Sequence, residues 1–408
     1  MKFNKWTLGL AAVGAVSMAS AVRADEAPKL VPLNTALSST TISGYVDVAA
    51  QYNMGNYGSF AGVPVGTAGT GIAPGTHKVD AFSFNDVDIA LDKPQDETPW
   101  ASGYHVELNA GTDAVGVGIN GSQATMASGT AAFGVRQGYV VIRTPVGNGI
   151  DWKVGIQDDI IGYEGNTDGA NPNYTRSYGY AVEPTTLLGL IGSYKITDAV
   201  TVQAGIADAT SPSFGTFTPT SDKTIAAAIA FTAPDSFGFA KGATLNLGAL
   251  LNLDKGGQDN YYAGVTIPTP LSMLKVGAAF DLVSVANEGS FGFNPHNDSG
   301  WVAGLYASLQ PTDKLSFNLR GEYFDLTGGY FNPYPASFGT AGANGRGEEI
   351  TATVQYNLWA NVISRVEFRW DHVDQGRAFA NNTSFGEALS GGADADAFML
   401  AANLIYTF

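Results

Sequence analysis

Charged side chains recur at every second position of one segment near the C-terminal end of the sequence. They are Arg365, Glu367, Arg369 and Asp371, and they alternate with Val366, Phe368 and Trp370. In a β-strand, alternate side chains point to opposite faces, so the four charges would share one face. Such a row is incompatible with a dry core but suits a water-filled lumen, where rows of charge select permeant solutes by their sign.

Two further segments carry the same chemistry. Residues 315–324 place Arg320 and Glu322 on the polar side of an alternating pattern, and residues 100–109 place Glu107 there. We therefore predict pore-lining roles for Glu107, Arg320, Glu322, Arg365, Glu367, Arg369 and Asp371. A connecting segment, 158–182, adds a second group of charges, which consists of Asp158, Asp159, Glu164, Asp168 and Arg176.

Motifs typical of enzymes and metalloproteins are weak in this sequence. Residues 116–121 have the glycine spacing of a dinucleotide fingerprint, but no helical pattern follows, so we interpret them as a glycine-rich loop. The four histidines lack metal-ligand spacing. Acid pairs at 158–159 and 394–396 could hold calcium, but they are more typical of solvated loops. We predict no metal site, no cofactor and no catalytic residue.

One enzymatic alternative stays open. His372 follows Asp371 at the end of an alternating segment, and Asp374 or Asp394 could complete an acid–histidine site there. Solvated charges at the rim of a barrel explain the same residues without catalysis.

The first 24 residues have the pattern of a secretory signal peptide. Lys2 and Lys5 form a basic start, residues 8–18 are apolar, and small residues precede candidate cleavage sites after Ala21 and Ala24. We expect cleavage after Ala24, export, and a short periplasmic lead over 25–40. The chain contains no cysteine, so disulfides and thiolate metal sites are excluded.

Charge and composition restrict the class of protein further. Removal of residues 1–24, which contain three basic residues and no acid, changes the formal net charge from −16 to −19. This charge weighs against nucleic-acid binding. The chain is 45% hydrophobic and contains 51 glycines, yet beyond the signal no apolar run is long enough for a transmembrane helix. These features favour sheet over helix.

Period-two alternation predicts sixteen strands of the length that crosses a membrane. The expected strands are 41–52, 80–92, 100–110, 133–144, 149–157, 183–196, 199–208, 223–232, 243–254, 258–267, 274–285, 301–310, 314–324, 348–357, 361–372 and 397–408. The predicted fold is therefore all-β, a transmembrane antiparallel up-and-down β-barrel of about 16 strands over residues 41–408. Outer-membrane lipid would surround it.

The connections between these strands differ in length in an ordered way. Odd-numbered connections are long, apart from 255–257, whereas no even-numbered connection exceeds ten residues. Outer-membrane barrels have long external loops and short periplasmic turns. The pattern therefore predicts the bacterial outer membrane, with both ends of the barrel in the periplasm. The five tryptophans after residue 24 agree, since each falls near a predicted membrane–water interface.

The last strand ends on an unbroken apolar face that includes Leu404, Tyr406 and Phe408. This ending resembles the C-terminal signal by which outer-membrane barrels are recognised for assembly. We therefore assign the signal to Tyr406 and Phe408 and expect the barrel-assembly machinery to be a partner.

Several motifs resemble the OmpL-like family of bacterial β-barrel porins. They are residues 41–47 (TISGYVD), 145–149 (PVGNG), 162–164 (GYE), 171–178 (NPNYTRSY), 183–184 (EP) and 358–372 (LWANVISRVEFRWDH). The similarity extends over essentially the whole chain after the signal. It implies a porin-like barrel and gives no solute.

These observations predict passive diffusion of small hydrophilic solutes and ions, with a modest cation preference from the acidic surplus. In general porins the third external loop folds inward, so we expect segment 158–182 to form a constriction. Its acids would face Arg320, Arg365 and Arg369 across the lumen and create a transverse field. Alternatively, the arginines pair with acids of the wall, or the loop stays outside.

Other arrangements remain open at this stage. General porins are trimers, which makes a homotrimer one arrangement to test. A barrel enzyme at the external rim and a plugged structural or adhesive barrel are the contrasting functions.

Overall fold

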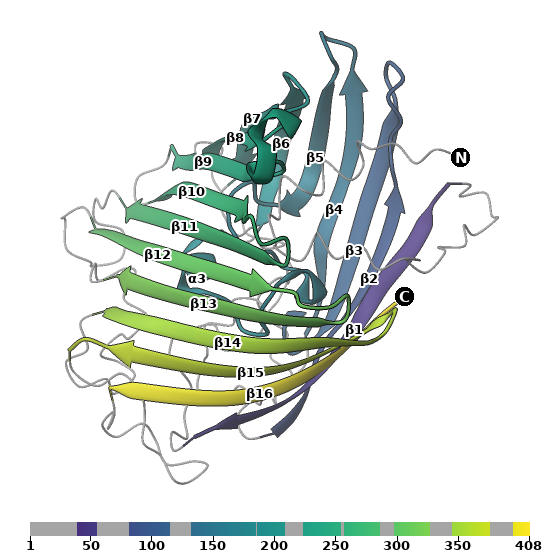
Figure 1. The fold of residues 1–408 in the computed structure, drawn as a ribbon. Coiled ribbons are helices and arrows are strands. Elements are labelled where there is room, and N and C mark those ends of the chain that lie inside the picture. The colour runs from purple at the N-terminus through teal and green to yellow at the C-terminus, as the bar shows by residue number, and fades with distance from the viewer. Residues whose placement is uncertain are drawn as a thin grey trace.

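A computed structural model describes residues 39–54, 81–114, 132–184, 186–208, 223–253, 257–285, 298–326, 345–375 and 395–408. These residues form sixteen strands in one closed antiparallel barrel, in which each strand pairs with its neighbours in the chain and β1 pairs with β16 (Figure 1). The predicted fold class is confirmed.

The predicted strand boundaries differ from the observed ones by at most three residues. The strands are β1 (Thr41–Asn53), β2 (Ala81–Lys93), β3 (Ser102–Gly111), β4 (Ala132–Thr144), β5 (Ile150–Asp158), β6 (Thr186–Lys195), β7 (Val200–Asp208), β8 (Lys223–Thr232), β9 (Thr244–Asn252), β10 (Gln258–Pro268), β11 (Leu274–Val285), β12 (Asp298–Leu309), β13 (Leu315–Asp325), β14 (Arg346–Trp359), β15 (Val362–Val373) and β16 (Asp396–Thr407).

Short helices occur in two connections of the described chain. They are η2 (Asp168–Ala170) and α3 (Tyr178–Val182) between β5 and β6, and η3 (Asp235–Ala240) between β8 and β9. Within the described ranges, no helix has the length and apolarity needed to cross a membrane.

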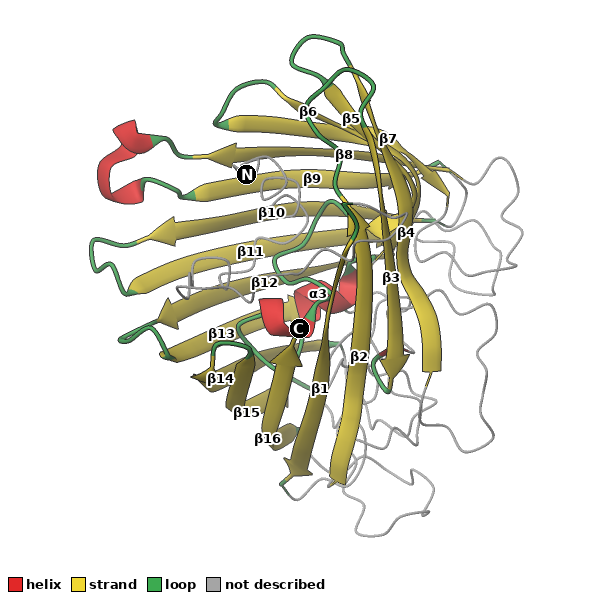
Figure 2. Cartoon of the chain, turned by 90° about the vertical axis from the view of Figure 1, so that its right-hand side faces the viewer, coloured by secondary structure: helices red, strands yellow, loops and turns green. Residues whose placement is uncertain are grey.

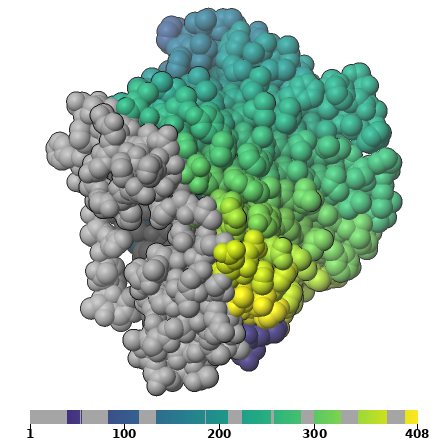
Figure 3. All heavy atoms as spheres, turned by 90° about the vertical axis from the view of Figure 1, so that its left-hand side faces the viewer, coloured from purple at the N-terminus to yellow at the C-terminus, as the bar shows by residue number. Residues whose placement is uncertain are grey.

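Alternation places apolar side chains outside and polar ones inside. On β13, Phe317 and Leu319 are 41% and 50% exposed, whereas Arg320 between Leu319 and Gly321 is fully buried. β15 follows the same rule, with Val366 exposed and its charged neighbours buried. The outward side chains of the C-terminal strands form a continuous outer surface (Figure 3). An apolar outer band of this kind is what contact with lipid requires.

The barrel is closed by the two ends of the folded chain. The backbone N–H of Gly44 donates to the carbonyl of Phe408 at 3.1 Å, and the N–H of Phe408 donates back at 2.9 Å. A Cβ atom at Gly44 would lie 2.1 Å from the carbonyl oxygen of Asp88 and 2.8 Å from the Phe408 ring, so only glycine fits there. Tyr406 and Phe408 face outward, and their role as an assembly signal stays a prediction.

The connection between β5 and β6 turns into the barrel rather than away from it. We call residues 159–184 the inner loop. Its helix α3 lies against β11 and β12, inside the ring of strands (Figure 2). The short turns lie together at one end of the barrel (Figure 2), as the alternating lengths of the connections predicted.

Candidate functional site

The inner loop is packed against the lumen wall. Ten consecutive residues, 171–180, are all buried. Arg176, Thr175 and Asn173 have no exposed surface at all, although each is polar. Buried polar groups need hydrogen-bond partners, and the strands of the wall supply most of them.

Carboxylates of the wall accept hydrogen bonds from backbone N–H groups of the loop. Glu367 on β15 accepts from Tyr174 and, at 2.9 Å, from Thr175. Glu322 on β13 accepts from Tyr178 at 2.7 Å and from Gly179 at 3.1 Å. Each glutamate therefore binds two successive N–H groups, an arrangement in which the charge strengthens both hydrogen bonds.

Arginines of the wall bind the carbonyl groups of the same loop. Arg320 donates to the carbonyl of Thr175 at 2.7 Å, and Arg369 donates to that of Arg176 at 2.7 Å. Arg365 donates to the carbonyl of Asn171 at 2.6 Å. Because β13 and β15 each contribute both donors and acceptors to residues 171–179, the loop is fixed along its length rather than at one point.

Ion pairs complete this contact. Arg320 pairs with Glu164 of the loop at 2.7 Å and with Glu349 of β14 at 3.1 Å. Arg369 pairs with Asp371 at 2.7 Å. Within the loop, Arg176 pairs with Asp168 at 3.0 Å.

These ion pairs bear on the predicted transverse field between the loop acids and the wall arginines. Glu164 and Arg320 are in direct contact, so they do not face each other across water as we expected. Pairing within the wall occurs for Arg369 with Asp371 at 2.7 Å, and more weakly for Arg320 with Glu322 at 3.9 Å. Glu164 of the loop and Arg320 of the wall thus neutralise each other in direct contact.

Aromatic side chains position the loop. Tyr163 stacks on Tyr306 of β12, and Tyr178 stacks on Phe324 of β13, each with ring centroids 3.9 Å apart. Ser177 caps the N-terminus of α3, and its hydroxyl accepts a hydrogen bond from the N–H of Tyr180. Aromatic stacking beneath the loop adds apolar contact to its polar attachments.

The opposite wall carries its own network. Glu107 on β3 forms a two-point ion pair with Arg136 of β4 and accepts from Gln137 at 2.8 Å. Arg136 also pairs with Asp158, the last residue of β5. His105 lies between Glu107 and Asp92, at 3.1 and 3.2 Å. Glu107 therefore lies buried in contact with a buried arginine, and its pore-lining role stays a prediction.

Sequence reasoning missed several of the buried charges. Asp47, Asp86 and Asp88 lie side by side on β1 and β2, and the tyrosine hydroxyl of Tyr45 donates to Asp86 at 2.9 Å. Glu349 was missed on β14. Alternation within 348–357 placed Glu349 on a polar face with Thr351 and Thr353, so this signal was available. On β2, alternation alone puts Asp86 on the same face as Phe84, and it misses the register shift that lies between the two residues.

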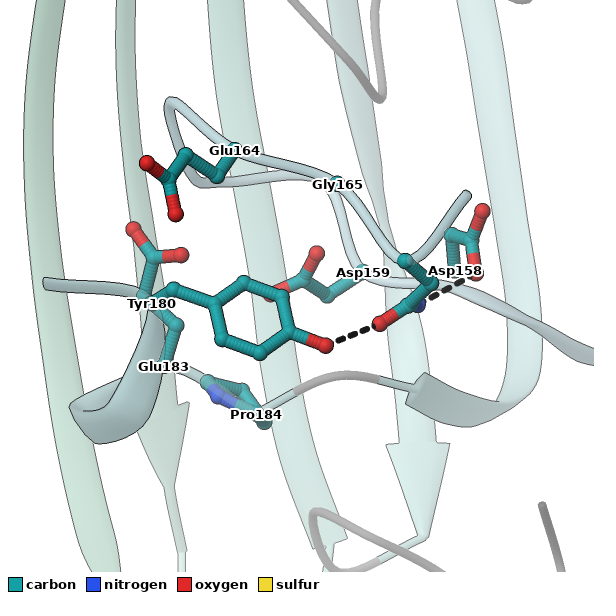
Figure 4. A pocket seen from close by; sticks show the side chains of 8 residues that line it. Asp158, Asp159, Glu164, Gly165, Tyr180, Glu183 and Pro184 are labelled. Carbon is teal, nitrogen blue, oxygen red and sulfur yellow. Dashed lines mark hydrogen bonds between the residues drawn. The ribbon is translucent and has the colours of Figure 1, made fainter. Parts of the chain in front are cut away.

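A small pocket lies where the inner loop leaves β5 and returns to β6 (Figure 4). Its lining consists of Asp158, Asp159, Glu164, Gly165, Asn166, Tyr180, Glu183 and Pro184. Burial raises the pKa of Asp159 well above its ordinary value, and the nearby Asp158 and Asp281 raise it further. Burial likewise raises the pKa of Glu183, and the carboxyl of Asp281 adds to the effect.

The residues of the enzymatic alternative are only partly brought together. His372 binds Asp396 through Nδ1 at 2.8 Å, while Asp371 is buried against Arg369. Asp374 accepts a hydrogen bond from Tyr323 at 2.8 Å, and Asp394 lies outside the described residues. In the described part of the chain, no group of three acids, histidines or cysteines is arranged for a metal ion.

A closed barrel with an apolar outer band, a polar lumen and an inward loop defines the class of outer-membrane porin-type barrels. The chain matches the family model described as "Putative beta-barrel porin-2, OmpL-like" over residues 39–408. It belongs to this family, and its location is the bacterial outer membrane.

Solved structures of other barrels resemble it in fold. OmpT, an outer membrane protein of Vibrio cholerae, has a TM-score of 0.56 at 12% identity, covering 93% of this chain and 100% of that one. The outer membrane channel DcaP of Acinetobacter baumannii has a TM-score of 0.55 at 11% identity, covering 90% and 97%. An anion-selective porin from Comamonas acidovorans has a TM-score of 0.52 at 11% identity, covering 91% and 99%. The curated proteins contain no match.

Proposed function

We propose that this protein is a diffusion channel for small hydrophilic solutes and ions that prefers cations, with the inner loop as its constriction. The observation that carries the proposal is the sign of the buried charge. Thirteen carboxylate side chains and five arginine side chains are buried among the described residues. They are Asp47, Asp86, Asp88, Glu107, Asp113, Asp159, Glu164, Asp168, Asp281, Glu322, Glu349, Glu367 and Asp371, against Arg136, Arg176, Arg320, Arg365 and Arg369.

These charges belong to the inner faces of the strands and to the loops that join them. Fixed negative charge in a narrow passage with low-dielectric walls raises the local concentration of cations. The excess of carboxylates therefore supports cation preference. Fixing of the loop by Glu322, Glu367 and the wall arginines supports its role as a stable constriction rather than a mobile flap.

Bilayer recording tests both parts of the proposal. Purified, refolded protein is inserted into a planar bilayer under a KCl gradient, and conductance and reversal potential are measured. We expect discrete conductance steps with a reversal potential that favours K⁺. Conductance steps with a reversal potential that favours Cl⁻ would support the channel and refute the cation preference.

A plugged barrel is the second candidate, and burial of residues 171–180 favours it. The inner loop also contacts the acidic side of the barrel, because Asn85 of β2 donates to the Tyr174 hydroxyl at 3.4 Å. A well-folded barrel without conductance would support this candidate over the channel. A homotrimer remains a prediction, which native mass spectrometry in detergent would test.

A further inference from the structure

The pocket at the base of the inner loop contains four carboxylates, but only two of them have a cationic or amide partner in the described chain. Asp158 accepts hydrogen bonds from Arg136 and, at 2.9 Å, from Asn166. Glu164 accepts from Arg320 at 2.7 Å and from the N–H of Ser177 at 2.8 Å. These two acids are thereby compensated.

The other two acids of the pocket have no such compensation. Asp159 is 9% exposed, and its Oδ2 atom has no hydrogen-bond partner. Glu183 is hydrogen-bonded to the carboxyl group of Asp281 on β11, which is another acid. Helix α3 covers Asp281 so closely that a Cβ atom at Gly179 would lie 2.7 Å from its Oδ2 atom. A buried acceptor left without a donor keeps its desolvation cost uncompensated, so this cluster has an unmet demand for N–H donors and for positive charge.

The size of the pocket restricts what could meet that demand. The centre of a water-sized sphere can move through only about 10 Å³, which is room for about one water molecule or one ammonium group. A sugar ring or a hydrated divalent ion is too large. A bare metal ion is disfavoured as well, because no three acids of the described residues are arranged to coordinate one.

The remaining lining suits a cation with N–H groups. Tyr180 lines the pocket, and its hydroxyl is held by a hydrogen bond to Asn166 (Figure 4). The aromatic ring attracts cations through its electron-rich face. The Asp158 side chain is 33% exposed, so solvent reaches this side of the pocket.

We propose that this pocket, through Asp159 and Glu183, binds the primary ammonium head group of small organic amines that enter the barrel. The inference rests on the proposed channel function, since the amine must reach the lumen. It names a solute class that the general cation preference does not. The ammonium group would donate hydrogen bonds to the free oxygen of Asp159 and to Glu183, and its positive charge would stabilise the ionised forms of both acids, which burial otherwise disfavours.

Methylammonium is the probe, because its three N–H donors fit a water-sized pocket. The matched control ligand is tetramethylammonium. It has the same charge but is larger and has no N–H donor. Binding of radiolabelled methylammonium to the folded protein in detergent is measured by equilibrium dialysis, with K⁺ as competitor. Block of the K⁺ current by both ions is measured in bilayers.

Asp159→Asn and Glu183→Gln are the test variants, and Asp198→Asn, in the exposed turn between β6 and β7, is the matched control. We expect methylammonium to bind and to slow the current, tetramethylammonium to do neither, and each test variant to raise the half-blocking concentration at least about tenfold. The control variant should behave as the unmodified protein does.

The outcomes separate this inference from the proposed function. The pocket assignment would be overturned if the two ammonium ions bound equally well, if K⁺ competed as well as unlabelled methylammonium, or if both test variants bound methylammonium unchanged. The proposed channel function would still be supported by measured conductance. Binding of methylammonium without any conductance would support the pocket and refute the channel.

Discussion

The attachment of the inner loop to the wall makes a quantitative prediction for Glu367→Gln. Glu367 is fully buried and accepts two backbone N–H bonds from the loop, as well as a hydroxyl bond from Thr353 at 2.7 Å. Glutamine removes the charge and turns one acceptor into a donor that faces an N–H group. A hydrogen bond to a charged group contributes about 1.5–3 kcal/mol, and the loss leaves a donor unsatisfied. We therefore expect loop attachment to weaken by about 2–3 kcal/mol.

Such a loss raises the population with a detached loop by roughly 30- to 150-fold. Trypsin reports it directly, because Arg176 has no exposed surface while the loop is bound. We expect the fragment that ends at Arg176 to form faster in Glu367→Gln, and also in Glu322→Gln, which weakens the second pair of backbone bonds. Single-channel current should become noisier in both variants. The rate of cleavage is measured by mass spectrometry after a heat-modifiability gel has shown that the barrel is folded.

Glu97→Gln is the matched control, since Glu97 is exposed in the turn between β2 and β3. Cleavage after Arg176 at the control rate in both lumen variants would show that the wall carboxylates do not hold the loop. Other contacts would then hold the loop in place, even if the channel conducts.

Four further predictions follow from other parts of the barrel. Phe408→Ala should reduce the amount of folded barrel in the outer membrane, because it removes the last residue of the proposed assembly signal. Phe237→Ala, at an exposed position of helix η3, is the control, and equal yields would refute the assignment. Raised pKa values of Asp159 and Glu183 mean that the folded state favours their protonated forms, so their contribution is fully present below their ordinary pKa of about 4 and is lost as pH rises. The thermal midpoint should therefore fall as pH rises, and less so in Asp159→Asn, whereas parallel curves would contradict this. His372→Ala should leave conductance unchanged, and a hydrolytic activity abolished by this change would instead support the rim enzyme. Asp86→Asn should shift the reversal potential toward that of Cl⁻ without faster cleavage at Arg176; an unchanged potential would show that this wall does not contribute to selectivity.

Strand parity explains why so much of the barrel could be predicted. Arg320 and Glu322 lie two residues apart, so both had to share a face, and the apolar residues beside them fixed that face as the inner one. The same rule argues against the acid–histidine site of the enzymatic alternative. Asp371 and His372 are adjacent in a strand and therefore point to opposite faces, which is why Asp371 is buried while His372 meets Asp396 across the β15–β16 pair.

Contacts of the inner loop could not be predicted in this way. Glu322 and Tyr178 are 144 residues apart, and no short-range pattern encodes which backbone N–H group a lumen carboxylate accepts. Register shifts add to the difficulty. At the register shift between β3 and β4, Glu107 is opposite Gln137 and Leu108 is opposite Val135, so Arg136 is the extra residue of a bulge. Alternation alone therefore did not predict the contact of Arg136 with Glu107.

Some charges inside the barrel are compensated by a partner and others are not, and this difference connects loop attachment with ion selectivity. Arg320 and Arg369 each bind a loop carbonyl and at least one carboxylate, so their positive charges are compensated locally. The surplus of carboxylates lies elsewhere, near Asp86 on the β1–β3 side and near Asp159 at the base of the loop. Substitution of Arg320 or Arg369 should therefore alter the bore and the position of the loop together. Substitution of the surplus carboxylates should alter ion preference while the loop stays bound. If the two effects could not be separated, the loop and the surplus charge would have to be treated as one electrostatic unit, and cation preference would depend on loop position rather than on the wall.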